Sequence, residues 1–434
     1  MSRPRRLLAV SWALPPVLAP RAIQVARTLR GLADRGWDVA ALAADPRTLP
    51  RGWRTDRSLA AVYPDPGWVE RLSSRPAWPL VGRLIPTLRQ RPDAFSAWAQ
   101  RAVQAGMRMV ARSRPAVLIS FAQPWSCHLA GWELARRSGL PWIAHFSDPW
   151  IETSWHGRRS AASQRFNVVH ERRVLERADA AVFVADEARR LMMRKHPSGW
   201  RGRTHVLPHS WDAALRRPPS QGDTSGRCRI VATGSLDESR DIAPLCAALR
   251  ALLDERELTP ADLLVRLIGP AHPQAHRARR RYGVEAIVHV EPPVDFARSL
   301  ELMHESDVLL LLDAPGSRVG HGHPEESPFL ASKTVEYLTA RRPILGLTPL
   351  RSPSAALLRR LGCAVVPPDD RGAIAAALRL LVRQHQAGGV RVPEPFDAVA
   401  DDYERAQVAV RWDALLSSVA MAGREGAARA LAAV

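Results

Sequence analysis

Lys333 and Glu336 are the two charged side chains whose spacing points most clearly to chemistry. They follow the apolar run 308–313 and a loop rich in glycine and histidine, and the pattern predicts a helix over residues 332–340. The free N–H groups at the start of such a helix, near Ser332, would attract an anion, and Lys333 adds a cation in the same turn. Glu336 could accept hydrogen bonds from vicinal hydroxyl groups. A surface ion pair on an ordinary helix is the competing interpretation.

Asp148 is a second candidate, because it follows the apolar run 142–146 and directly precedes Pro149, where the chain must leave a sheet. A carboxylate at this place could position a reacting hydroxyl group or stabilise positive charge that develops as a bond breaks. The alternative is an aspartate that caps backbone N–H groups. His145 is predicted to pack in the core.

Short apolar runs alternate with helical patterns along almost the whole chain, which predicts βαβ units and parallel sheets covered on both faces. The expected strands are residues 7–13, 39–43, 59–63, 116–121, 142–146 and 180–184, then 229–233, 263–268, 287–290, 308–313, 344–347 and 364–366. The expected helices are residues 22–35, 96–113, 128–138, 161–177 and 186–195, then 242–255, 296–306, 332–340, 354–361, 372–385 and 399–419.

The length of 434 residues exceeds what one core usually fills. We expect an α/β protein with two Rossmann-like domains that face each other across a cleft, and a C-terminal helix that crosses back to the first domain. Residues 1–210 would form the first domain, residues 211–227 a hinge rich in proline, serine and glycine, residues 228–395 the second domain and residues 396–434 the closing helix. Ligands of such sheets bind outside the carboxyl ends of the strands.

The formal net charge of +19 is concentrated in one half of the chain. Residues 1–217 hold 36 Lys and Arg against 16 Asp and Glu, a net charge of +20, whereas residues 218–434 hold 26 against 27, a net charge of −1. The two halves are therefore expected to bind different partners.

Residues 51–114 carry 12 arginines against four acidic residues. Tryptophans are interleaved with them at four positions, Trp53, Trp68, Trp78 and Trp98. An anionic membrane surface would attract such a segment. Nucleic acid would attract it too, but the prolines leave no helix that could read a groove, so no nucleic acid is expected. A solvated basic surface with core tryptophans is the third interpretation.

The four cysteines lie far apart without a C-x-x-C pair, so neither a zinc site nor a compact disulfide framework is predicted. The apolar run 7–19 after three arginines imitates a signal peptide, but Pro15 and Pro16 interrupt it, and a buried first strand is the preferred interpretation. No stretch approaches the roughly 20 apolar residues of a membrane-spanning helix. The expected location is the cytoplasm. If the protein binds a membrane, we expect peripheral attachment to its inner face.

The run S-K-x-x-E-Y-L-x-x-x-R-P-I-L, which begins at Ser332, resembles the nucleotide-sugar motif of GT-B glycosyltransferases, most closely the retaining family 4 group (glycosyltransferase group 1). Four further segments resemble parts of the same family in the right order, namely residues 142–150, 177–184, 207–212 and 231–241. The resemblance spans nearly the whole chain and implies the GT-B fold.

Carried over onto this sequence, the resemblance implies that Glu336 binds the donor ribose and that Arg240 clamps the donor diphosphate. Gly234, Ser235 and Ser332 would complete the donor site. Arg240 and Lys333 would stabilise the departing nucleoside diphosphate in place of a metal ion, so neither a metal nor another cofactor is expected. The nucleotide sugar is then a co-substrate.

Three segments depart from the family pattern. Where the family carries E-x7-E, Pro328 stands eight positions before Glu336; Glu325 or Glu326 would substitute, and Glu326 joins Asp148 as a catalytic candidate. The glycine-rich turn after the first strand is replaced by P-P-V-L-A-P-R at residues 15–21. The turn P-N-G-x-D has histidine and serine, at positions 209 and 210, in place of asparagine and glycine.

The expected function is transfer of a sugar from a nucleotide-sugar donor to a saccharide or lipid-linked acceptor, with retention of anomeric configuration, in polysaccharide or glycolipid biosynthesis. The basic first domain would bind the acceptor, with an anionic membrane surface as a further partner. Two alternatives stay open. One is a sugar-nucleotide epimerase or hydrolase of the same fold, which needs a second acid/base group beside Asp148. The other is an inactive binding member of a polysaccharide assembly complex, which the missing first glutamate of E-x7-E favours.

Overall fold

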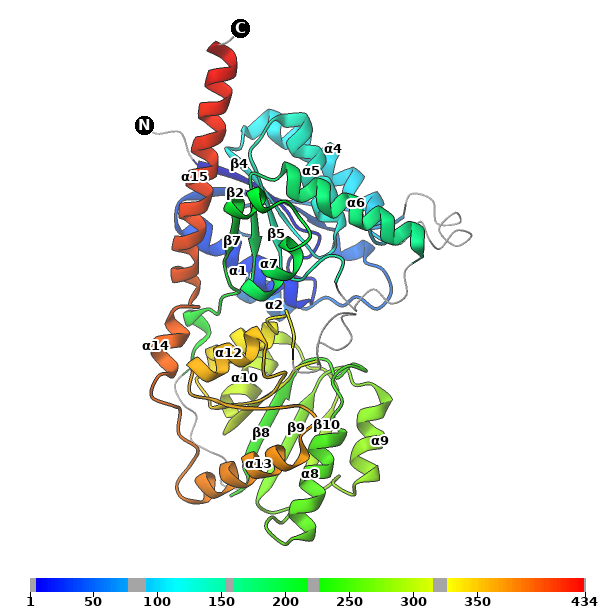
Figure 1. The fold of residues 1–434 in the computed structure, drawn as a ribbon, viewed down its shortest axis with the longest axis vertical. Coiled ribbons are helices and arrows are strands. Elements are labelled where there is room, and N and C mark those ends of the chain that lie inside the picture. The colour runs from blue at the N-terminus through cyan, green and yellow to red at the C-terminus, as the bar shows by residue number, and fades with distance from the viewer. Residues whose placement is uncertain (1–4, 77–90, 153–159, 218–225, 315–325, 433–434) are drawn as a thin grey trace. The chain divides into compact units, whose positions relative to one another are not determined.

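The computed structural model describes residues 5–76, 91–152, 160–217, 226–314 and 326–432 (Figure 1). The chain forms two compact units. Residues 1–210 and 405–434 make up the N-terminal unit, and residues 211–404 make up the C-terminal unit. Each unit is a parallel sheet with helices packed on it, so the prediction of two Rossmann-like α/β domains is confirmed.

The N-terminal unit contains a seven-stranded sheet in the order β3-β2-β1-β4-β5-β6-β7. Its strands are β1 (Arg5–Val10), β2 (Trp37–Ala44), β3 (Trp68–Leu72), β4 (Val117–Phe121), β5 (Trp142–Phe146), β6 (Ala180–Phe183) and β7 (Thr204–Val206). All pairs are parallel, and the strand order reverses between β1 and β4. The carboxyl ends of β1, β4 and β5 at this reversal are where an open α/β sheet places its ligand.

Helices cover both faces of this sheet. They are α1 (Pro20–Asp34), α2 (Arg57–Val62), α4 (Ser96–Ser113), α5 (Ser126–Ser138), α6 (Ala161–Arg177), α7 (Asp186–Met193) and α15 (Arg405–Ala432), with short 3-10 turns at Pro46–Thr48 and Ser198–Arg203. Apolar side chains of α4, α5 and α6 form one core cluster, and those of α1 and α15 form another.

Helix α15 packs on α1, so the prediction of a C-terminal helix that crosses back to the first domain is confirmed (Figure 1). Asp413 anchors it, because its carboxylate accepts hydrogen bonds from Arg5 Nη1 at 2.7 Å and from Arg35 Nε and Trp37 Nε1 at 2.9 Å each. The expected closing helix over residues 396–434 is two helices. α14 (Phe396–Asp401) belongs to the C-terminal unit and α15 to the N-terminal unit.

The C-terminal unit contains a six-stranded parallel sheet in the order β10-β9-β8-β11-β12-β13. Its strands are β8 (Cys228–Thr233), β9 (Leu263–Ile268), β10 (Val288–Glu291), β11 (Val308–Leu312), β12 (Ile344–Leu347) and β13 (Ala364–Val366). Its other helices are α8 (Ala243–Asp254), α9 (Pro273–Arg281), α10 (Phe296–Glu305), α11 (Ser332–Glu336), α12 (Pro353–Arg360) and α13 (Arg371–Gln386), with 3-10 turns at Ala213–Leu215 and Tyr337–Ala340.

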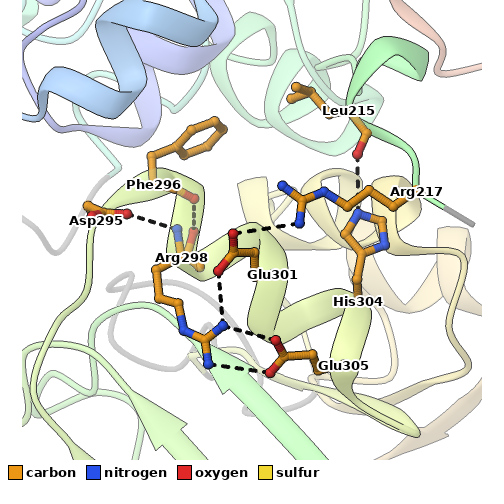
Figure 2. A network of polar contacts seen from close by, with 9 residues as sticks. Leu215, Arg217, Asp295, Phe296, Arg298, Glu301, His304 and Glu305 are labelled. Atoms are coloured by element: carbon orange, nitrogen blue, oxygen red, sulfur yellow. Dashed lines mark hydrogen bonds and ion pairs between the residues drawn. The ribbon is translucent and has the colours of Figure 1, made fainter. Parts of the chain in front are cut away.

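The first residues of the expected hinge are fixed to the C-terminal unit. Trp211 is buried, pairs with Glu404 in a β-bridge and donates its indole N–H to the carbonyl of Ala400 at 2.7 Å. Figure 2 shows the next residues held against α10, where Leu215 O lies 3.2 Å from His304 Nε2 and Arg217 lies 3.6 Å from Glu301. Residues 218–225 of the expected hinge lie outside the described residues.

One predicted strand is wrong. Residues 59–63 belong largely to helix α2, because Asp56 caps its first turn by accepting hydrogen bonds from the backbone N–H groups of Ser58 and Leu59 at 2.8 and 3.2 Å. The strand that occupies this edge of the sheet is β3, whose side chains are all exposed or half-buried, so it lacks the continuous apolar run of a central strand. In the described part of the chain, no helix has the length and apolarity needed to cross a membrane.

Candidate functional site

Two glycine turns meet at the carboxyl edge of the C-terminal sheet. Gly234 follows β8 with a φ of +136°, and Gly269 follows β9 with a φ of +151°. A Cβ atom on Gly269 would collide with the carbonyl group of Gly234. Only glycine fits this combination of backbone conformation and close approach, so the two turns form a compact surface on which Gly234 and Ser235 stay exposed.

Tyr337 fixes the motif helix α11 on this edge. Its hydroxyl group accepts a hydrogen bond from the N–H of Thr233 and donates one to the carbonyl of Leu310, each at 3.1 Å. Burial raises the pKa of Tyr337 to about 12, so the hydroxyl group stays protonated. As a result Lys333 extends over Gly234, with its Cε atom 3.7 Å from where a Cβ of residue 234 would lie. The structure therefore brings Lys333 and Gly234 together.

Glu336 is buried, with 3% of its surface exposed, whereas Ser332 and Lys333 are half-buried. The helix that carries them is shorter than expected, because only residues Ser332–Glu336 are α-helical before the chain tightens into a 3-10 turn. Few aligned peptide dipoles contribute to so short a helix. The cation of Lys333 is therefore the main source of positive potential here, and the predicted helix dipole adds little.

Arg240 lies beyond the first glycine turn and forms an ion pair with Asp237, which also accepts a hydrogen bond from the N–H of Ser239 at 2.9 Å. Its side chain is 23% exposed. The charge of Arg240 partly offsets the rise that burial causes in the pKa of Asp313, so the two groups lie within electrostatic range of each other.

Asp313 is a candidate that the sequence analysis missed, since it was counted as the last residue of a strand. Its carboxylate is buried and accepts hydrogen bonds from Thr348 Oγ1 at 3.0 Å and from the N–H of Ala314 at 2.8 Å. Burial raises the pKa of Asp313, and the charge of Arg240 only partly offsets this. The available signal was its position after β11, which is the same signal that identified Asp148.

Glu326 is half-exposed and lies beside the turn after β12, where it forms an ion pair with Arg351 at 3.2 Å. In the described ranges this is its one ion pair, and no hydrogen bond joins it to Lys333 or Glu336. Glu325 lies outside the described residues.

Asp148 stands at the carboxyl end of β5 in the N-terminal unit. Its carboxylate accepts hydrogen bonds from Ser147 Oγ at 2.9 Å and from Gln123 Nε2 at 3.3 Å. Both donors are side chains, unlike the backbone N–H groups of an aspartate that only caps a turn. Trp150 holds the segment in place, since its ring stacks on Trp125 with 4.9 Å between centroids and an interplanar angle of 5°.

Three further polar side chains gather near Asp148. Arg21, in the first turn of α1, places Nη1 3.4 Å from Nδ1 of His145. His145 is buried as predicted, against Phe121 and Trp412, and His209 is buried as well.

Electrostatics couple these groups. Burial lowers the pKa of His209 to about 3 and that of His145 well below its usual value, and the charge of Arg21 adds to both shifts. Both rings are therefore neutral near pH 7. Burial raises the pKa of Asp148, and Arg21 partly offsets the increase.

The N-terminal cluster thus comprises Arg21, His145, Asp148 and His209, of which the sequence analysis selected only Asp148. A signal for two others was present. Arg21 and His209 both stand where the sequence departs from the family pattern, in the segment after the first strand and in the turn at residues 207–212.

Within the described ranges, no group of three or more His, Cys, Asp or Glu side chains is arranged to hold a metal ion. The expectation of a reaction without metal or other cofactor stays a prediction.

Residues 22–210 match the glycosyl transferase 4-like domain family. No curated protein sequence matches the chain. Among solved structures, HepE of Anabaena, determined in complex with UDP and glucose, is similar with a TM-score of 0.65 and 13% identity over 95% of this chain and 99% of its own.

Two other solved structures have the same architecture. Sucrose-phosphate synthase from Thermosynechococcus elongatus has a TM-score of 0.66 and 15% identity over 96% of this chain and 100% of its own. A putative UDP-N-acetylglucosamine 2-epimerase from Listeria monocytogenes has a TM-score of 0.55 and 12% identity over 96% and 97%. At these identities the likeness establishes the fold. The chain therefore has the GT-B fold, and its residues 22–210 form a glycosyl transferase 4-like domain.

Proposed function

We propose that this protein transfers a sugar from a nucleotide-sugar donor, bound at the carboxyl edge of the C-terminal sheet, to a saccharide or lipid-linked acceptor bound by the N-terminal unit. The observation that carries the proposal is the position of Lys333 over the exposed Gly234, with Glu336 one turn further along the same buried motif. A cation, an open backbone turn and a carboxylate are the groups that a nucleoside diphosphate requires.

Each donor-site residue has a distinct role in the proposal. Glu336 accepts hydrogen bonds from the ribose hydroxyl groups, and Ser235 and Ser332 offer hydroxyl groups to the phosphates. Lys333 contacts the diphosphate directly, and Arg240 does so by exchanging its ion pair with Asp237 for the ligand. HepE was solved with UDP and glucose, which supports a nucleoside diphosphate as the ligand class.

In the proposed reaction the bond between the anomeric carbon and the diphosphate oxygen breaks, and a bond from that carbon to the acceptor oxygen forms. The departing diphosphate gains negative charge, which Lys333 and Arg240 stabilise without a metal ion. Asp148 positions the acceptor hydroxyl group and accepts its proton as the new bond forms. Burial raises the pKa of Asp148, which makes its carboxylate a stronger base for this step. Glu326 would contact the donor sugar once its ion pair with Arg351 opens. Retention of configuration follows the family 4 resemblance.

The acceptor side of the proposal includes a membrane surface. Trp53 and Trp68 are 39% and 47% exposed, and Arg51 and Arg54 beside Trp53 are exposed too. Trp98 is fully buried and belongs to the core, and Trp78 lies outside the described residues. Exposed tryptophan beside arginine suits the headgroup level of an anionic membrane. We therefore infer peripheral attachment to the inner face of the membrane and a role in polysaccharide or glycolipid biosynthesis.

Titration with a panel of nucleotide sugars tests the donor site. At least one donor should raise the unfolding temperature, and Glu336→Gln should weaken its binding at least about tenfold, the loss of one charge-assisted hydrogen bond. The control Glu285→Gln changes an exposed glutamate of the same unit and should bind normally. Absence of binding by every donor would overturn the proposal.

Incubation of the best donor with membrane extract tests the reaction itself. Appearance of labelled sugar in an acceptor supports transfer. Conversion of the nucleotide sugar without an acceptor would favour the epimerase or hydrolase alternative. Tight donor binding without any turnover would favour an inactive binding protein.

A further inference from the structure

Arg21 carries a positive charge that the fold leaves without a close counter-charge. In the described part of the chain its side chain makes one hydrogen bond, the 3.4 Å contact with His145, and no ion pair within 4.0 Å. Burial lowers the pKa of Arg21 to about 10, which still leaves it cationic near pH 7. A cation that the fold withdraws partly from water without a paired anion is costly, and a ligand anion would offset that cost.

The groups around Arg21 do not neutralise it. His145 and His209 are uncharged, as their lowered pKa values require. Burial also raises the pKa of the Cys127 thiol, so this group is neutral too. Asp148 attracts Arg21 electrostatically, but it lies beyond ion-pair distance and is bonded to Ser147 and Gln123 instead.

A second arginine of the same helix, Arg27, has a structural role and serves as a comparison. Arg27 is fully buried and donates hydrogen bonds to Tyr63 Oη at 2.7 Å and to the carbonyl of Ser210 at 2.8 Å. These bonds tie α1 to α2 and to the last residue before the C-terminal unit. Arg21 has no comparable set of bonds, although it stays half-buried with part of its surface open to solvent.

The start of α1 adds to the positive potential at this point. The helix is 15 residues long, and its N-cap residue, Ala19, offers no side chain to the first turn. The positive end of the helix dipole therefore lies beside the guanidinium group of Arg21, and both favour an anion.

We propose that Arg21 binds an oxyanion of a substrate, a phosphate or a carboxylate, beside His145, which contacts it, and His209, which lies within electrostatic range. The inference deepens the proposed function and rests on it, since it gives the glycosyltransferase a negatively charged group to recognise in its N-terminal unit. A planar guanidinium fork fits both oxyanions in bidentate geometry. The group is carried either by an acidic or phosphorylated acceptor sugar or by the donor diphosphate.

Thermal unfolding of the full chain with defined probes tests the assignment. Inorganic phosphate, glucose 6-phosphate and glucuronate, but not glucose, should raise the unfolding temperature of the wild type. Arg21→Gln should abolish these shifts, and Arg21→Lys should reduce them. Arg30→Gln removes an exposed arginine from the same helix and should leave them intact. Equal shifts in wild type and Arg21→Gln, with both folded by circular dichroism, would overturn the proposal.

UDP as a further probe separates the two sources. Loss of glucose 6-phosphate and glucuronate binding in Arg21→Gln, with UDP binding unchanged, assigns the oxyanion to the acceptor. Weakened UDP binding assigns it to the donor, and both results support the proposal. If the probes do not require Arg21, the role of Arg21 is wrong. The proposed function would still stand if donor binding depends on Glu336. The two failures are therefore distinguishable.

Discussion

The hydroxyl group of Tyr337 lies 3.1 Å from the backbone nitrogen of Thr233 and accepts its hydrogen bond. This contact joins the last residue of β8 to the motif helix, and the same hydroxyl group reaches β11 through the carbonyl of Leu310. The tyrosine of the E-Y-L motif thus positions Lys333 over Gly234 without contacting a ligand itself. It is a positioning residue for the proposed donor site.

Tyr337→Phe should destabilise the C-terminal unit and weaken donor binding together. The substitution leaves the buried N–H of Thr233 without an acceptor, at a cost of about 1–3 kcal/mol. Chemical denaturation and nucleotide titration measure the two effects. Tyr282→Phe changes a half-buried tyrosine of the same unit and should affect neither. Unchanged stability of Tyr337→Phe would show that the hydrogen bond contributes nothing.

Gly269→Ala should be strongly destabilising and should abolish donor binding. The added Cβ would meet the Gly234 carbonyl, and the φ of +151° is unfavourable for alanine, so we expect a loss of at least about 2 kcal/mol. Gly388→Ala is the matched control, because Gly388 also has a positive φ, +114°, but nothing lies within 4 Å of an added Cβ. A similar loss in both variants would mean that backbone strain, and not the contact between the two turns, is the cause.

Most of the fold could be predicted from the sequence, since buried parallel strands give continuous apolar runs. Strands β5, β9, β12 and β13 have the bounds that the apolar runs predict. The elements that were missed give weak signals for physical reasons. Strand β3 is an edge strand with no buried side chain, β7 has three residues, and α9 ends in three arginines.

The candidate sites were less predictable, because each depends on contacts between distant segments. The motif run indicated Lys333 and Glu336, but nothing local in the sequence places Lys333 over Gly234, 99 positions earlier (333 − 234). Arg21 became a candidate only when the fold placed it beside His145. An arginine in an arginine-rich sequence stands out little, so the departure of residues 15–21 from the family pattern was its one signal.

Arg51→Gln combined with Arg54→Gln should weaken binding to anionic vesicles. Each cation near such a surface contributes about 1 kcal/mol, so the pair should cost about 30-fold in affinity at low salt. Co-sedimentation with phosphatidylglycerol-containing and pure phosphatidylcholine vesicles measures the effect. Arg371→Gln with Arg383→Gln removes the same charge from the exposed surface of the C-terminal unit and should have little effect. Equal binding to both vesicle types by the wild type would contradict an electrostatic attachment.

Stability should fall as the pH drops below about 6.5, the pKa of a histidine in an unfolded chain. Burial lowers the pKa of His128 and of His209 to about 3 and that of His145 well below its usual value. The unfolded chain therefore binds protons that the folded chain does not bind. Each such histidine lowers the free energy of unfolding by up to about 2 kcal/mol at pH 5.

His209→Asn, which introduces the residue of the family turn, should reduce this sensitivity. Because the variant lacks one of the groups that bind a proton only in the unfolded chain, its free energy of unfolding should fall by up to about 2 kcal/mol less than that of the wild type between pH 7 and pH 5. Urea denaturation at both pH values gives the difference directly. Above about pH 7.5 the two proteins should differ by a nearly constant amount, since His209 is almost entirely neutral there in both the folded and the unfolded state. Parallel curves down to pH 5 would mean that folding does not lower the pKa of His209, which would remove the basis for assigning it as a neutral neighbour of Arg21.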